Sequence, residues 1–95
     1  SESLAADIDL NSWEPPRIFQ WIQETGDIDD LEMLRTFNCG IGFVIASKPQ
    51  NSHKILSSLN KFAENAQVIG KVVPIGTEPE SNHLVVESTG FTLNK

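Results

Sequence analysis

The first third of the chain predicts one strand followed by two helices. Residues 5–10 alternate between apolar side chains and aspartates, which is typical of a short, half-buried strand. Pro15 and Pro16 favour a helix start, because proline is tolerated in the first turn, and Gly26 is a natural helix end. A second helix is expected from Asp29, with Glu32 at the spacing of a capping box. The predicted buried pair of the second helix is Leu31 and Leu34, and the apolar face of the first consists of Ile18, Phe19, Trp21 and Ile22.

The middle and end of the chain predict a further strand, a helix and two more strands. Residues 41–46 form an almost unbroken apolar run, which indicates a strand covered on both faces. Residues 52–64 carry apolar side chains at helical spacing, with Ser52 as the N-cap. Strands are expected at 68–73 and 84–87, joined as an antiparallel hairpin by a polar loop. The tail after residue 88 carries little pattern.

The order of these elements favours an α/β (α+β) fold. Strand, helix, helix, strand, helix, strand, strand predicts a mixed sheet of about four strands with helices packed on it. A chain of 95 residues is one small domain at most. Because so few elements are available to cover the strands, we expect the chain to be part of a larger domain.

Composition narrows the class of partner. Seven Lys and Arg stand against 13 Asp and Glu, giving a net charge of −6, which argues against nucleic acid or an anionic membrane as a partner. Cys39 is the only cysteine, so neither an internal disulfide nor a cysteine-based zinc site is expected. With no long apolar stretch and no secretory signal in view, we expect a cytoplasmic location.

Three groups of residues could carry chemistry but have simpler structural interpretations. His53 and His83 lack ligand partners at metal spacing, which indicates exposed or lightly packed histidines. An acidic cluster could hold a divalent cation but lacks the pattern of a calcium loop, and acids at a helix start explain it more simply. Three aromatic residues could form a stacking platform, although at their spacing a core role is favoured. The acidic cluster is Asp27, Asp29, Asp30 and Glu32, and the aromatic residues are Trp13, Phe19 and Trp21.

Residues 35–42 stand apart from these groups. The segment places a cation, a hydroxyl, an amide, a thiol and two glycines between a helix end and an apolar run. Glycine lets a ligand or another backbone approach closely, so both a binding loop and a packing role remain open. Cys39 is not favoured as a nucleophile, because no base or cation is evident that would lower its pKa.

The same segment carries a resemblance to a known family. Residues 32–42, EMLRTFNCGIG, closely resemble the signature of phosphoribosylformylglycinamidine cyclo-ligases, also called aminoimidazole ribonucleotide synthetases. Gln67 stands where many members of the family have tryptophan, which changes packing only. The resemblance covers roughly residues 6–87 and includes Ser12-Trp13, Pro16, Ile18-Phe19, Trp21-Ile22-Gln23, Gly26, Glu64-Asn65-Ala66 and Ile69-Gly70.

The resemblance implies an ATP-dependent ligase of purine biosynthesis. Members convert formylglycinamidine ribonucleotide to aminoimidazole ribonucleotide, use ATP and Mg²⁺, and form homodimers, with nucleotide, metal and substrate around a cleft between two domains. Residues 1–95 would be the last part of the C-terminal domain, without the N-terminal ATP-binding domain. We therefore expect the chain alone to be inactive, with no catalytic, cofactor-binding or metal-binding residue of its own.

The resemblance, together with the position of the loop, gives one set of expected site residues. Thr36, Asn38 and Gly40 are predicted to face the cleft on the substrate side, while Phe37 packs inward. The alternative for the whole chain is a free-standing binding or assembly module that reuses the fold without catalysis.

Overall fold

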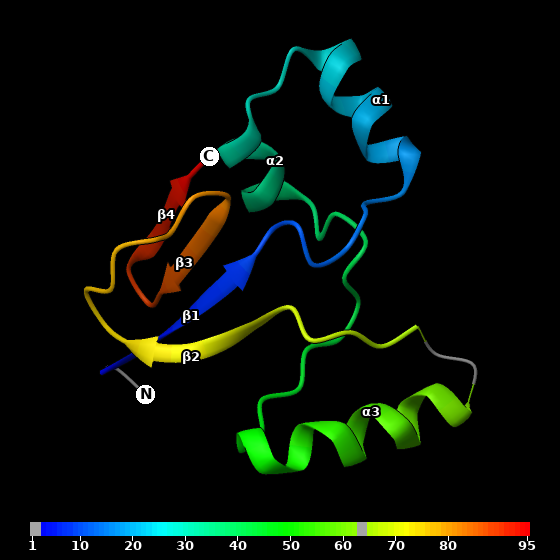
Figure 1. Cartoon of the computed structure of the whole chain (residues 1–95). Coiled ribbons are helices and arrows are strands. Elements are labelled where there is room, and N and C mark those ends of the chain that lie inside the picture. The colour runs from blue at the N-terminus through cyan, green and yellow to red at the C-terminus, as the bar shows by residue number, and fades with distance from the viewer. Residues whose placement is uncertain (1–2, 63–64) are drawn as a thin grey trace. The chain divides into compact units, whose positions relative to one another are not determined.

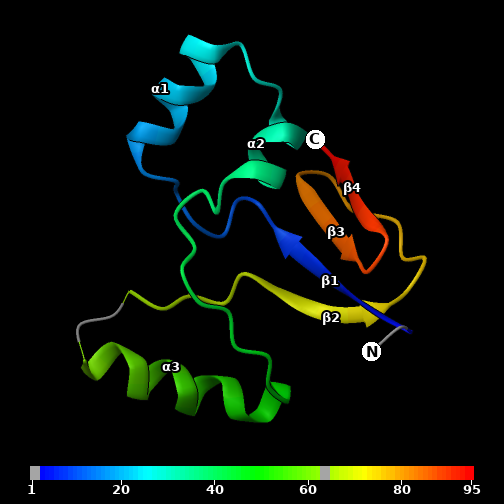
Figure 2. The same cartoon turned by 180° about the vertical axis from the view of Figure 1, so that it is seen from behind.

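A four-stranded antiparallel sheet organises much of the chain in the computed structural model, which describes residues 3–62 and 65–95 (Figure 1). Its strands lie side by side in the order β2-β1-β3-β4, as both cartoon views show (Figure 2). The strands are β1 (Leu4–Asp9), β2 (Gly70–Pro74), β3 (His83–Glu87) and β4 (Gly90–Asn94). The segment with the clearest alternation of apolar and acidic residues, β1, is therefore a central strand.

The register of the sheet explains which side chains become buried. Ala5 pairs with Val73 on β2, and Asp7 pairs with Val85 on β3. Because side chains alternate across a strand, these four residues lie on one face of the sheet. Ala5, Val73 and Val85 form the buried apolar cluster on that face. Asp7 is also buried, with 4% of its surface exposed, so a carboxylate lies at the edge of this small core.

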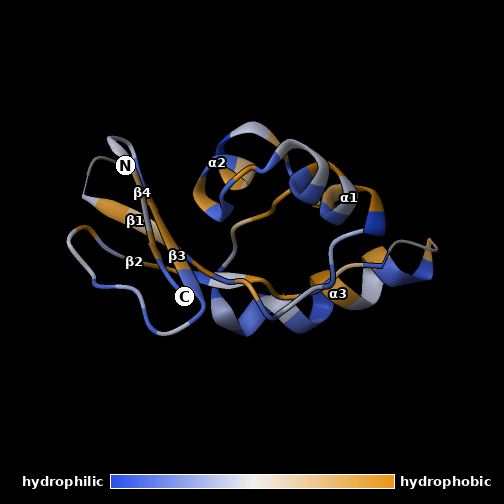
Figure 3. Cartoon of the chain, turned by 90° about the horizontal axis from the view of Figure 1, so that it is seen from above, coloured by the Kyte–Doolittle hydropathy of each residue, from blue (hydrophilic) through white to orange (hydrophobic). Residues whose placement is uncertain are grey.

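Three α-helices complete the fold, and one of them begins with a side-chain cap. They are α1 (Arg17–Gly26), α2 (Asp30–Thr36) and α3 (Ser52–Lys61), the last preceded by a short 3₁₀ turn at Pro49–Asn51. Asp29 caps α2 by accepting a hydrogen bond from the Glu32 N–H at 2.8 Å. The predicted N-cap of α3 is wrong, because Ser52 is its first helical residue and Asn51 before it makes no side-chain cap hydrogen bond. The helix ends at Lys61, before the predicted end at 64, and residues 63–64 lie outside the described residues. Figure 3 shows that α3 carries both apolar and polar residues around its circumference.

The chain divides into two compact units. One consists of Ser1–Trp13 with Ile45–Lys95 and contains the sheet and α3, and the other is Glu14–Val44 with α1 and α2. No helix within the described part of the chain is long and apolar enough to cross a membrane.

The α+β class, with about four strands and three helices, is confirmed, but one predicted strand is wrong. Residues 41–46 are irregular, and Phe43 is 99% exposed. An apolar run supplies apolar side chains, but a strand also needs a neighbouring backbone to pair with. In the described sheet this segment pairs with no strand. The fourth strand is instead Gly90–Asn94, in the tail where no element was predicted. The sheet is also entirely antiparallel rather than mixed. The predicted hairpin of the strands at 68–73 and 84–87 is wrong, because β1 lies between β2 and β3.

Burial on the helices differs from the sequence prediction. In α2 the buried residue is Met33, while Leu31 and Leu34 are only half-buried. In α1 no residue is fully buried, and Trp21 is 62% exposed, so a core role for Trp21 is wrong. Helical spacing identifies a face of a helix correctly, but it does not supply the surface that covers the face.

Candidate functional site

The loop after α2 is a tight turn built by Asn38. Its side-chain Oδ1 accepts a hydrogen bond from the Gly40 N–H at 3.0 Å, and its backbone carbonyl accepts one from the Ile41 N–H at 3.1 Å. Cys39 and Gly40 both adopt positive φ, 52° and 107°. A side chain at Gly40 would also place a Cβ 2.7 Å from Cδ of Pro16, so glycine satisfies two separate constraints there.

The three predicted site residues are exposed at the junction of α2 and this loop, with Thr36 as the last residue of the helix. Thr36 donates a hydrogen bond through Oγ1 to the Glu32 carboxylate at 3.3 Å. Asn38 and Gly40 follow at alternate positions, and all three residues are classed as exposed. Phe37 is half-buried and packs its ring edge-on against Phe19, with centroids 6.0 Å apart. The loop therefore presents a hydroxyl, an amide and an accessible backbone to solvent while an aromatic side chain anchors it.

Cys39 lies in the same loop but does not have the properties of a nucleophile. Its side chain is buried, and its thiol lies 3.9 Å and 3.8 Å from the carbonyl oxygens of Met33 and Phe37. Burial raises the pKa of the Cys39 thiol, which favours the neutral, unreactive form. This environment agrees with the sequence-based expectation that Cys39 is not favoured as a nucleophile.

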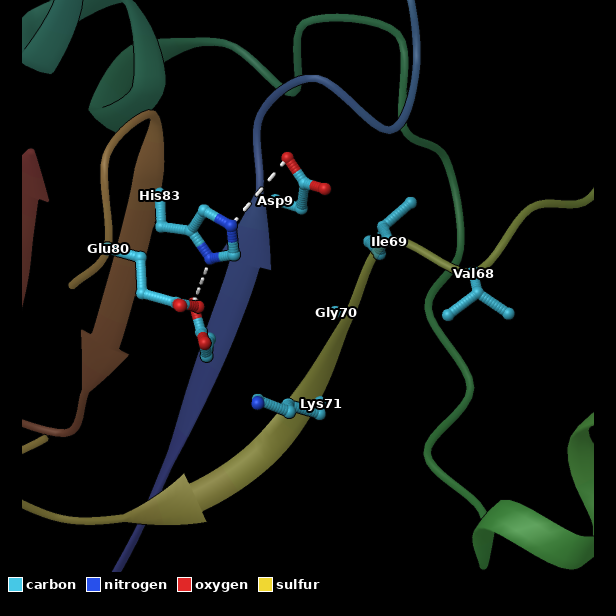
Figure 4. Close-up of a pocket in the computed structure, with 8 residues that line it drawn as sticks. Asp9, Val68, Ile69, Gly70, Lys71, Glu80 and His83 are labelled. Atoms are coloured by element: carbon cyan, nitrogen blue, oxygen red, sulfur yellow. Dashed lines mark hydrogen bonds and ion pairs between the residues drawn. The ribbon is translucent and has the colours of Figure 1, made fainter. Parts of the chain in front are cut away.

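A second cluster of functional groups lies on the sheet, where sequence reasoning did not predict one (Figure 4). His83 Nδ1 lies 2.7 Å from Oδ1 of Asp7, and His83 Nε2 lies 3.8 Å from Oδ1 of Asp9. The two strands create this contact, because β1 and β3 pair with Asp9 opposite His83. The Asp7 side chain is only 5% exposed and the His83 ring 19% exposed. The interpretation of His83 as a histidine without ligand-type partners is therefore wrong.

These residues line a shallow hollow together with residues of β2 and the turn before β3. Glu80 lies in that turn, and its backbone carbonyl accepts a hydrogen bond from the His83 N–H at 3.0 Å. Lys71 on β2 is opposite Asp7 in the register and also borders the hollow. The hollow therefore combines one imidazole with three carboxylates and one ammonium group.

The environment of His83 favours its charged form. The hydrogen bond to Asp7 raises the pKa of His83 above its ordinary value; partial burial opposes this, and the charges of Asp7, Asp9 and Glu80 reinforce it. A histidine with a raised pKa in the folded state stabilises the fold below its unfolded pKa, and this contribution is lost as pH rises through the folded pKa.

We expect His83 to make the sheet more stable to urea at about pH 5.5 than at about pH 8.5, on either side of its ordinary pKa. The measurement is urea unfolding at both pH values for the native chain and for His83→Gln. The native chain should lose more stability between the two values than the variant does. An equal loss of stability in both proteins would show that protonation of His83 is not coupled to folding through its contact with Asp7.

His53 and Asp29 have the simpler structural roles. His53 is exposed on α3, as predicted. Asp29 acts as a helix cap, which confirms that at least part of the acidic cluster stabilises a helix start.

Comparison with known proteins identifies relatives that share most of this chain. A family model described as "AIR synthase related protein, C-terminal domain" matches residues 1–78. The chain is 51% identical over 73 residues to a phosphoribosylformylglycinamidine cyclo-ligase of Pseudothermotoga lettingae, covering 77% of this chain and 22% of that protein. It is 42% identical over 72 residues to the trifunctional purine biosynthetic protein adenosine-3 of Homo sapiens, covering 76% of this chain and 7% of that protein.

A further relative gives the same picture. The cyclo-ligase of Chromobacterium violaceum is 42% identical over 71 residues, covering 75% of this chain and 21% of that protein. The chain thus spans about a fifth or less of the length of these relatives. No solved structure shows a significant match to it.

Proposed function

Because the chain belongs to the family of AIR synthase related C-terminal domains, we propose that it supplies the C-terminal part of a phosphoribosylformylglycinamidine cyclo-ligase. The complete enzyme would close formylglycinamidine ribonucleotide to aminoimidazole ribonucleotide with ATP, in a cytoplasmic homodimer. The observation that carries this proposal is the family match over residues 1–78, which includes the whole loop after α2. Relatives at 42% to 51% identity named as cyclo-ligases or as a purine biosynthetic protein support it.

The loop after α2 is the part of the chain that we assign to the substrate side. Thr36 offers a hydroxyl, Asn38 an amide, and Gly40 a backbone that a ligand can approach closely. These neutral groups suit hydrogen bonds to the ribose, phosphate or amidine of a ribonucleotide. Their role would be to bind and orient the substrate, because none of them has the acidity or basicity of a proton-transfer group at neutral pH.

The loop does not have the properties of a site for ATP with Mg²⁺. A triphosphate site needs several available backbone N–H groups or basic side chains. Here the N–H groups of Gly40 and Ile41 are already donated to Asn38, and the Arg35 guanidinium lies 3.9 Å from the Glu32 carboxylate. We therefore assign the binding of ATP and its Mg²⁺ to the remainder of the complete enzyme, and derive no step through them from this chain.

A chimeric enzyme tests the proposed function. The 73 matched residues of this chain would replace the corresponding segment of the Pseudothermotoga lettingae cyclo-ligase. We expect the chimera to retain ring closure, measured as formation of aminoimidazole ribonucleotide. A control chimera that carries Thr36→Ala and Asn38→Ala, two exposed positions, should fold but lose activity. A folded chimera with the native residues but without activity would contradict the proposal and favour a binding or assembly module.

The chain alone should neither turn over substrate nor bind ATP tightly. We expect an ATP dissociation constant no lower than about 1 mM, a binding free energy of about −4 kcal/mol or weaker. Calorimetric titration of the chain with ATP and Mg²⁺ measures this directly, with the complete Pseudothermotoga lettingae enzyme as the positive control. Micromolar affinity of the chain would show that it contains a nucleotide site.

A further inference from the structure

We propose that Asp7, Glu80 and His83 form a binding site for a single divalent transition-metal ion of the Zn²⁺ type. One ligand atom from each residue lies within 4.8 Å of the others. The three residues come from β1, from the turn before β3 and from β3, so the folded sheet creates the site. This departs from the sequence-based expectation that the chain has no metal-binding residue, and it does not depend on the cyclo-ligase proposal.

The backbone holds the three ligands in place. Asp7 and His83 lie on adjacent strands whose register is fixed by the pairing of Asp9 with His83. Glu80 is tied to the same position by the hydrogen bond from the His83 N–H to its carbonyl at 3.0 Å. In Figure 4 the side chains of Glu80 and His83 both extend from the β3 side over β1. Binding would therefore cost little backbone reorganisation, since two ligands lie on strands and the third on a short closed turn.

The burial of Asp7 is the observation that separates this cluster from ordinary surface charges. A carboxylate with a 5% exposed side chain is costly unless it is paired with a donor or coordinates a metal. His83 now supplies the partner at 2.7 Å, and it exposes 19% of its own side chain to the hollow. A metal ion bound in the hollow would take the place of this contact between the two groups.

The chemistry of the ligands favours zinc-like ions over magnesium or calcium. An imidazole nitrogen with carboxylate oxygens suits Zn²⁺, whereas Mg²⁺ and Ca²⁺ prefer sites made of oxygen ligands alone. Three protein ligands leave at least one position for water or for a donor from another molecule. Asp9 adds a further negative charge beside His83, while Lys71 at the border of the hollow opposes cation binding.

Zinc titration of the untagged 95-residue chain tests the site. We expect saturable binding of one Zn²⁺ by calorimetry, with His83 as the histidine whose ring signals shift in NMR spectra. Replacing His83 by alanine should weaken binding at least tenfold. His53→Ala is the matched control, because it removes the other imidazole from an exposed position on α3, and it should leave the affinity unchanged.

A second pair of variants keeps the test valid if His83→Ala fails to fold. Glu80 and Glu78 are both exposed residues of the same loop, so Glu80→Gln and Glu78→Gln carry similar folding risk. Only Glu80→Gln should weaken Zn²⁺ binding, by at least threefold, and an equal concentration of Mg²⁺ should not displace the zinc. The proposal would be overturned if Zn²⁺ binding is not saturable, if both variants of either pair lose Zn²⁺ affinity equally, or if Mg²⁺ displaces the zinc.

Discussion

Replacing Asn38 by alanine lowers kcat/KM at least tenfold in a complete cyclo-ligase that carries this segment, while the melting temperature changes little. Tenfold corresponds to a loss of about 1.4 kcal/mol of transition-state stabilisation. We expect this because the Asn38 amide is exposed on the loop assigned to the substrate side, where its N–H groups can donate to a ribonucleotide. The hydrogen bond that alanine would remove, from the Gly40 N–H to Oδ1, is also exposed and contributes little to stability.

Replacing Asn38 by aspartate distinguishes a role of this residue in substrate binding from a role in forming the turn. Asn38→Asp keeps an oxygen that can accept from the Gly40 N–H, but it removes the amide donor and adds a charge. If Asn38 acts on the substrate, both variants lose activity. If Asn38 only shapes the turn, Asn38→Asp keeps near-normal kcat/KM, and the alanine variant loses activity only in step with its melting temperature. Steady-state kinetics and thermal unfolding of the same preparations decide between these outcomes.

Replacing Gly70 by alanine unfolds or severely destabilises the sheet. Gly70 begins β2 and pairs with Ile8, and a methyl group there would overlap the backbone carbonyl oxygen of Asp7. Because the opposing atom belongs to the backbone of the central strand, neither partner can rotate away. We expect a loss of at least about 3 kcal/mol in the free energy of unfolding. For a domain of this size that lowers the melting temperature by more than about 10 °C.

Gly42→Ala is the control for this substitution. An added methyl group at Gly42 would meet nothing within 4 Å, and the residue does not adopt a positive φ. Its variant should unfold within about 0.5 kcal/mol of the native chain, as for an ordinary surface substitution. Circular dichroism during heating compares all three proteins. A Gly70→Ala chain as stable as the control would mean that β1 and β2 do not approach each other in this register.

Local sequence signals predicted those elements whose cause is local. The cap at Asp29, the proline start of α1 and the alternation in β1 each act within a few residues, and each appears in the structure. The run at 41–46 failed as a strand because pairing depends on a distant backbone that the run itself does not specify. Phe91 and Leu93 alternate with Thr92 and Asn94 in β4, a signal too short to distinguish from a polar tail.

The two clusters of functional groups differ in how far apart in the sequence their residues lie. Because Thr36, Asn38 and Gly40 lie within five residues of one another, the sequence alone predicts that they lie together. Asp7 and His83 are 76 residues apart, and nothing near either residue indicates the other. Only the register of β1 with β3 brings them into contact, and a shift of one residue would turn His83 to the opposite face.

The unit that contains the sheet is built from two separate stretches of the sequence, and this affects how the chain folds. The central strand, β1, is separated in sequence from both of its partners by the whole of Glu14–Val44 and by α3. During synthesis β1 therefore cannot pair with β2 or β3 until residues 70–74 have left the ribosome, whereas the unit at 14–44 can form first from local contacts. The late closing of β2 and β3 around β1 would make the sheet the slow step of folding. Its unpaired central strand would also be the segment that most needs protection by a chaperone in the interval.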